Sequence, residues 1–131
     1  MAKRVLSVGQ CVPDGMALKS FLAQRFSADV EASATADEAM ALLHNGPFDL
    51  VLVNRVFDAD GGSGQEFIEA LKANPTTGKI PGMLVSNYAD AQQQAVAAGA
   101  EPGFGKAQLG ADEVAEQLAP YLTADSAEAA P

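Results

Sequence analysis

The chain has 131 residues, of which 48% are hydrophobic, and it carries a formal net charge of −9. This length suits one domain, and no run of residues approaches the about 18 consecutive apolar residues that a membrane span requires. The acidic balance disfavours direct nucleic-acid binding, because phosphate backbones repel negative charge. The single cysteine, Cys11, excludes an intramolecular disulfide and a multi-cysteine metal site. The N-terminus lacks the features of a signal peptide, so we expect a cytoplasmic protein.

Short strand-like runs alternate with helical patterns in the first part of the chain. Residues 5–8 form a compact run rich in β-branched side chains, which predicts a strand. Apolar residues at helical spacing then predict a helix from about Asp14, and residues 29–32 predict a second strand. The second helix should begin after Thr35, because Thr35 and Glu38 have the spacing of a capping box.

The clearest strand in the sequence is 49–54, whose core is apolar on both faces, as a central parallel strand must be. A glycine-rich loop follows it. Ser63 and Glu66 form a second capping box and predict the start of the third helix. A fourth strand is predicted at 83–86.

The last part of the chain has weaker patterns. An alanine-rich helix is predicted at 91–98 and a very short strand at 103–105. Apolar spacing over 114–122 predicts a final helix, which Pro120 should kink or shorten. The polar and small residues of 123–131 predict a disordered tail.

Five strands alternating with five helices predict a three-layer α/β fold with a doubly wound parallel sheet, in the flavodoxin-like order 2-1-3-4-5. In this arrangement a site forms at the carboxyl ends of the strands. The residues expected there are Gly9, Gln10, Cys11, Asn54, Arg55, Val56, Ser86, Asn87 and Lys106.

Three stretches of the sequence resemble the receiver domain of two-component response regulators. They are FDLVLVN at 48–54, IPGMLVSNYAD at 80–90 and GAEPGFGKAQL at 99–109. The resemblance covers roughly residues 3–122, and we assign a receiver-like domain to 1–122. It implies the fold predicted above.

The resemblance also implies which positions should carry phosphoryl chemistry, and here the chain departs from the family. The family's acidic pair, which holds Mg²⁺ with the acceptor aspartate, corresponds to Gly9 and Gln10. The aspartate that accepts the phosphoryl group corresponds to Asn54. A hard divalent cation prefers anionic oxygens, and the nucleophile must be an oxyanion. We therefore expect no Mg²⁺ cofactor, no aspartyl phosphorylation and no enzymatic activity.

Two family positions persist and one is lost. Ser86 matches the hydroxyl residue that contacts the phosphoryl group, and Lys106 matches the family's lysine, although it lacks obvious carboxylate partners here. Ala107 stands where the family usually has proline. Gly103 occupies the aromatic switch position, and Phe104 comes one residue too late to replace it without a register shift.

These features predict a stand-alone pseudo-receiver in bacterial signal transduction that acts through protein–protein contacts. In the family, the fourth helix, fifth strand and fifth helix form the usual partner surface, so we expect binding of another signalling protein, or homodimerisation, there. Gln93, Val96 and Val114 are expected on this surface, and the glutamines of 92–94 should form a solvated face. The surface extends from Asp90 to Gly99, from Gly103 to Lys106 and from Ala111 to Leu122.

Two alternatives remain open from the sequence. Residual phosphorylation in a phosphorelay could use Asp58 or Asp60, although aspartates in a glycine-rich loop are more often solvated turn residues. Alternatively, Lys106 and Ser86 could bind a small anion with the help of backbone N–H groups, as in a ligand sensor.

Overall fold

The computed structural model describes residues 2–123, so the tail predicted at 123–131 lies outside the described residues except for Thr123. The strands are β1 (Arg4–Val8), β2 (Asp29–Ser33), β3 (Leu50–Asn54), β4 (Gly82–Val85) and β5 (Glu101–Phe104). The α-helices are α1 (Val12–Phe26), α2 (Ala36–Asn45), α3 (Gly64–Ala73), α4 (Ala89–Ala97) and α5 (Asp112–Leu122), with a short 3₁₀ turn at Lys106–Gln108. None of these helices is both long enough and apolar enough to cross a membrane.

The strands form one five-stranded sheet in the order β2-β1-β3-β4-β5, and the strand pairs are parallel. The predicted fold class and strand order are therefore confirmed. Strand β3 is buried along its whole length, as its apolar pattern indicates. The pairing of β4 with β5 is irregular, because Met83 pairs with Glu101 whereas Val85 pairs with Phe104, which leaves one extra residue on β5.

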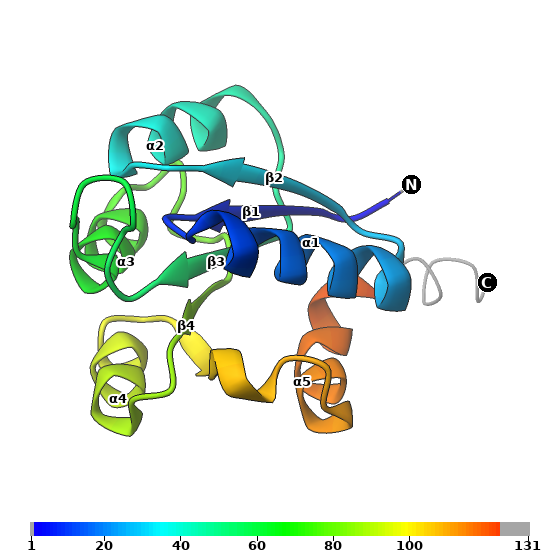
Figure 1. The fold of residues 1–131 in the computed structure, drawn as a ribbon. Helices are drawn as coiled ribbons and strands as arrows, with labels where there is room; N and C mark the ends of the chain where they lie inside the picture. The colour runs from blue at the N-terminus through cyan, green and yellow to red at the C-terminus, as the bar shows by residue number, and fades with distance from the viewer. Residues whose placement is uncertain (1, 124–131) are drawn as a thin grey trace.

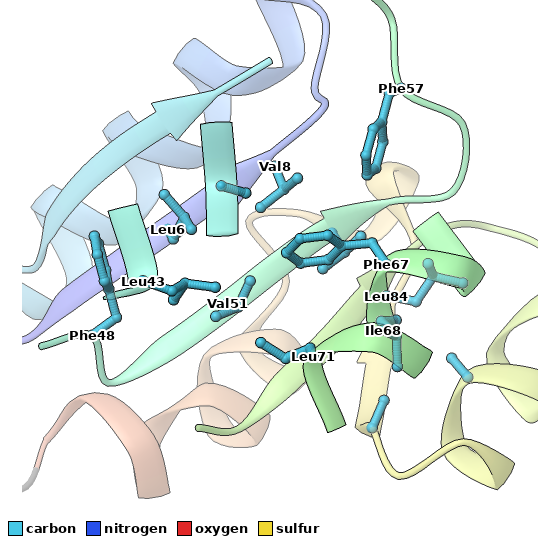
Figure 2. Packing of buried hydrophobic residues seen from close by; sticks show 14 residues of the cluster. Leu6, Val8, Leu43, Phe48, Val51, Phe57, Phe67, Ile68, Leu71 and Leu84 are labelled. Carbon is cyan, nitrogen blue, oxygen red and sulfur yellow. The ribbon is translucent and has the colours of Figure 1, made fainter. Parts of the chain in front are cut away.

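The sheet separates two hydrophobic clusters. Figure 1 shows how the helices and the strands are arranged. Helices α1 and α5 pack on one face, where Leu22 and Leu118 are completely buried against the sheet. Helices α2, α3 and α4 cover the other face, and Figure 2 shows the cluster that they form with β1, β3 and β4. This cluster includes Phe57, which lies on the loop after β3 and forms a T-shaped pair with the Phe67 ring.

Local signals position the helix starts. Thr35 and Ser63 are the N-caps of α2 and α3, and their hydroxyls accept hydrogen bonds from the N–H groups of Glu38 and Glu66 at 3.3 and 3.1 Å. The returning bond of the first capping box differs from the usual pattern, because the Glu38 carboxylate accepts from Ala34 N–H and not from the cap residue.

Most boundaries differ from the sequence-based expectations by one or two residues, and three elements illustrate why. Helix α1 begins at Val12 and not near Asp14, because Pro13 is favourable in the first turn of a helix. Strand β5 is Glu101–Phe104, so it begins and ends earlier than the predicted 103–105. Helix α5 continues through Pro120 to Leu122, since a proline in the last turn removes only one helical hydrogen bond.

Candidate functional site

The carboxyl ends of β3 and β4, together with Lys106 two residues after β5, surround one hollow of about 220 Å³. It brings together Asn54, Ser86 and Lys106, which are distant in the sequence. Arg55, Val56, Asn87 and Tyr88 complete most of its wall. The hollow therefore lies where the strand order predicts a site.

The side chain of Asn54 is held between the loops that follow β1 and β3. Its amide nitrogen donates to the carbonyl oxygens of Gly9 at 2.9 Å and Val56 at 2.7 Å. The side chain is only 7% exposed, so both bonds form in a largely dehydrated place. An amide can donate to both carbonyls, whereas an ionised carboxylate could not. Asn54 thus joins the two loops.

The place beside Gly9 is filled by an aromatic ring. Gly9 has a φ of +76°, and a Cβ atom on it would lie 2.2 Å from the Phe57 ring. Phe57 is itself 1% exposed, and the N–H of the next residue, Asp58, donates to the Gly9 carbonyl at 3.0 Å. Gly9, which was expected to match the first residue of the receivers' acidic pair, therefore has neither the backbone conformation nor the space for a carboxylate side chain.

Gln10, the second position of that pair, does not line this hollow. It lines a different groove, between α1 and β2, together with Ser33. Neither polar atom of its amide has a hydrogen-bond partner within the described residues, although both atoms are buried.

Lys106 has a carboxylate partner, which corrects the expectation that it lacks one. Its Nζ lies 3.0 Å from Oδ2 of Asp14. The lysine lowers the pKa of Asp14 by hydrogen bonding, and Cys11 adds a smaller hydrogen-bond contribution, while partial burial opposes both. Asp14 is in the first turn of α1, which starts at the same edge of the sheet. The Lys106 ammonium group is therefore paired with a carboxylate from helix α1.

Ser86 and Asn87 also have partners inside the chain. Ser86 is 6% exposed, and its hydroxyl accepts a hydrogen bond from Tyr88 N–H at 3.2 Å. The Asn87 side-chain oxygen accepts from Ala107 N–H at 3.1 Å. These bonds fix the loops after β4 and β5, and the Arg55 guanidinium lies 4.8 Å from the centre of the Tyr88 ring above them.

Gln92 fills the position where an aromatic side chain on Gly103 would be expected. Its Nε2 donates to Leu84 O at 2.8 Å and to Ser86 O at 3.1 Å. Its Oε1 accepts from Gly103 N–H at 3.1 Å. A Cβ atom on Gly103 would lie 2.0 Å from Leu84 O and 2.8 Å from Gln92 Oε1. The expectation that Gln92 belongs to a solvated face is therefore wrong, because it fastens α4 to β4 and β5.

The bulged strand β5 is held from the other side as well. Gln117 on α5 donates to the carbonyls of Pro102 and Gly103. The register shift does not bring Phe104 into the place of the switch residue, because Phe104 is 3% exposed and packs in the layer under α1 and α5. Val114, expected on the surface, is also part of that layer and is 2% exposed.

The glycine-rich loop after β3 places both of its aspartates in solvent. Asp60 accepts from Gly62 N–H at 2.9 Å and so stabilises a tight turn. Asp58 is exposed and contributes its backbone N–H to the contact with Gly9. Among residues 2–123, no group of three or more His, Cys, Asp or Glu side chains is arranged to hold a metal ion.

Solved structures with the same fold are receiver domains and response regulators. The signal receiver domain of a DNA-binding response regulator, merR, from Colwellia psychrerythraea 34H superposes with a TM-score of 0.75 at 24% identity, over 90% of this chain and 96% of that one. A response regulator receiver protein from Pseudomonas putida gives 0.76 at 18%, over 92% and 98%. The chemotaxis protein CheY4 of Vibrio cholerae gives 0.72 at 18%, over 93% and 99%.

No family model matches the sequence, and no curated protein matches it significantly. At these identities the structural likeness establishes the receiver fold over nearly the whole chain. The activity has to be argued from the hollow itself.

Proposed function

We propose that this chain is a receiver-like module of two-component signal transduction that acts by binding a partner protein, without phosphorylation of an aspartate. Support comes from the receiver fold and from the bonding of Asn54. Its amide donates to two carbonyl oxygens, so the position that would attack phosphorus is neutral and already engaged.

The proposal includes the absence of a bound Mg²⁺ ion. The residues around the hollow do not fit one, because no carboxylate is among its lining residues and the carboxylate that contacts Lys106, Asp14, is paired with it. Phe57 occupies the space that a side chain on Gly9 would need. A hard cation with this ligand set would keep most of its hydration shell and bind weakly.

Partner binding is proposed at the surface formed by α4, β5 and α5. A hollow of about 310 Å³ lies on it, lined by Gln92, Gln93, Val96, Pro102 and Gly103. Val96 is 42% exposed, which is high for a large apolar side chain. The glutamine bonds from α4 and α5 fix the backbone beneath this hollow, so the surface is ready for a partner without a switch. The partner is another signalling protein or a second copy of this chain.

Phosphorylation is tested by incubating the purified chain with acetyl phosphate and Mg²⁺ and measuring the intact mass. We expect no added phosphate mass. If the mass appears, Asp58→Asn and Asp60→Asn variants identify the acceptor, and the phosphorylation-free proposal is wrong.

Partner binding is tested with a charge at the exposed apolar position, Val96→Glu. The matched control is Ala41→Glu, which places the same charge on the exposed side of α2. Sedimentation velocity measures self-association, and the stoichiometry of a complex isolated from the native cell measures hetero-association. We expect Val96→Glu to weaken the complex at least about tenfold, since burying an unpaired charge is unfavourable. Equal effects of both variants would contradict the proposed surface.

A further inference from the structure

A second hollow, of about 400 Å³, lies between α1 and β2 at the same edge of the sheet. We call it the α1–β2 groove. Its lining residues are Ser7, Gln10, Cys11, Val12, Gly15, Met16, Lys19, Ala32, Ser33, Ala34 and Glu38. It shares no lining residue with the hollow around Asn54. Small residues at several of these positions leave the space that larger side chains would fill.

The α1–β2 groove gathers buried polar atoms that have no partner. The hydroxyls of Ser7 and Ser33 and both amide atoms of Gln10 are four of the five such side-chain atoms found within residues 2–123. Ser7 is 2% exposed and Ser33 is 6% exposed. Folded proteins leave few buried polar atoms unpaired, because these lose water without gaining a hydrogen bond. Their concentration around one hollow favours a bound molecule that supplies the missing bonds.

The lining defines the chemistry of such a molecule. The unpaired groups are neutral, and an amide presents a donor and an acceptor side by side in one plane. The charged residues Lys19 and Glu38 are exposed, and the Glu38 carboxylate already accepts from Ala34 N–H. A charged ligand placed against the neutral groups would not be compensated there.

An apolar rim completes the groove. Val12 and Met16 are 73% and 66% exposed, so one turn of α1 presents two large apolar side chains to solvent. Methionine adapts its shape to irregular partners. A volume of this size is within the usual range for small-molecule pockets.

We propose that the α1–β2 groove binds a small, neutral, planar amide or heterocycle. The adjacent donor and acceptor of the ligand pair with the Gln10 amide and the hydroxyls of Ser7 and Ser33, and its apolar face rests against Val12 and Met16. The site is independent of the function proposed above, because it uses none of the residues around Asn54 or on the α4-β5-α5 surface.

The first test compares two serines with the same exposure. Ser33 and Ser86 are each 6% exposed, but only Ser86 has a hydrogen-bond partner in the structure. Without ligand, Ser33→Ala should leave the melting temperature unchanged or raise it, because an unpaired polar group is removed. Ser86→Ala should lower it by about 4 °C. A loss in Ser33→Ala as large as that in Ser86→Ala would show that the Ser33 hydroxyl is already paired, and it would overturn the proposal.

The second test uses nicotinamide and nicotinate. They have the same ring, but nicotinamide carries a neutral amide where nicotinate carries a carboxylate. Backbone amide signals are followed by NMR during titration of the purified chain. We expect nicotinamide at millimolar concentration to shift signals from 7–19 and 32–38, and nicotinate to bind at least about tenfold more weakly. Adenine serves as a larger neutral probe with adjacent donors and acceptors.

Variants decide whether the shifts come from the α1–β2 groove. Gln10→Leu removes the amide and keeps a similar volume, and Ser7→Ala provides a second variant in the buried strand. Each should weaken nicotinamide binding at least about tenfold, while Asn87→Ala on the neighbouring hollow should not. The proposal is overturned if neither neutral probe shifts these signals, if nicotinate binds as well as nicotinamide, or if the groove variants bind like the wild type.

Discussion

Two hollows lie at the same edge of the sheet, and they differ in how their polar groups are satisfied. Around Asn54, the amide, the Ser86 hydroxyl and the Lys106 ammonium group each bind another part of the chain. In the α1–β2 groove, Ser7, Ser33 and Gln10 have buried polar atoms with no partner among residues 2–123. The first hollow lies where the strand order predicts a site, but internal bonds engage the groups that would act on a ligand.

This difference gives a criterion for distinguishing polar groups that bind a ligand from polar groups that stabilise the fold. Paired groups contribute to stability, and a substitution there should weaken the fold. Unpaired groups reduce stability, and a substitution there should affect binding before it affects folding. The substitutions below test whether changes at paired groups weaken the fold. The comparison of Ser33→Ala with Ser86→Ala tests whether removal of an unpaired group leaves the fold intact.

The largest effect is expected for Asn54→Asp, which places a carboxylate at the end of β3. It replaces a donor to the carbonyls of Gly9 and Val56 with a carboxylate that faces the same oxygens. We expect the free energy of unfolding, measured by urea denaturation, to fall by about 3 kcal/mol at neutral pH. The deficit should shrink in acid, where a protonated carboxyl becomes a donor.

Asn87→Asp provides the control for this substitution. Asn87 is exposed and uses its side-chain oxygen as an acceptor, which aspartate preserves. Its effect should stay within about 0.5 kcal/mol. An Asn54→Asp variant that is as stable as the wild type and gains phosphate mass would erase the contrast between the two hollows.

A smaller loss is expected for Gln92→Ala, which removes the contact between α4 and the bulged end of the sheet. Two carbonyls, of Leu84 and Ser86, lose their side-chain donor, and the Gly103 N–H loses its acceptor. We expect a loss of about 2 kcal/mol together with faster hydrogen exchange at Gly103.

The neighbouring residue supplies the control, because Gln93 is exposed. Gln93→Ala should change the stability by less than about 0.5 kcal/mol. Equal losses in the two variants would mean that helix propensity, and not the contact with β4 and β5, explains the effect.

The sequence predicted the architecture because the information for it is local. The apolar run of β3, the capping residues and the alternation of strands with helices are each readable over a few residues. Strand-end positions then placed Asn54, Ser86 and Lys106 at one edge, since parallel strands end together. Nothing more than strand order was needed for this juxtaposition.

The partners of these residues could not be predicted in the same way, because they depend on helix rotation and side-chain packing. Asp14 lies in the first turn of α1, which begins at Val12, and there it contacts Lys106. The position of an acidic residue at a helix start near the sheet edge was the one sequence signal for this ion pair. Gln92 and Gln93 are the same residue type, and they differ in burial and in the bonds of Gln92 to β4 and β5, which the sequence does not reveal. Ser7 did carry a signal, since it is a polar residue within a buried strand.

The smallest effect is expected for Asp14→Asn, which removes the ion pair with Lys106. The two side chains are 40% and 34% exposed, so solvent screens the pair and we expect a loss of about 0.5 kcal/mol at neutral pH. Because the pKa of Asp14 is lowered in the folded protein, the pair stabilises the fold above the carboxyl's unfolded pKa. This contribution is lost as the pH falls through the lower, folded-state value.

The deficit of Asp14→Asn, measured by urea denaturation, should therefore be complete at pH 7, shrink as the pH falls below the ordinary carboxyl pKa, and disappear once the pH is below the lowered pKa of Asp14 in the folded protein. It should also vanish in a Lys106→Met background, where no partner remains. Asp112→Asn is the control, because Asp112 is 82% exposed and lies 3.6 Å from Arg25, so its effect should be smaller. A deficit that persists at pH 7 in the Lys106→Met background would mean that Asp14 acts on the first turn of α1 alone. Lys106 would then be free to bind an anion, and the hollow around Asn54 would no longer differ from the α1–β2 groove in having its polar groups paired.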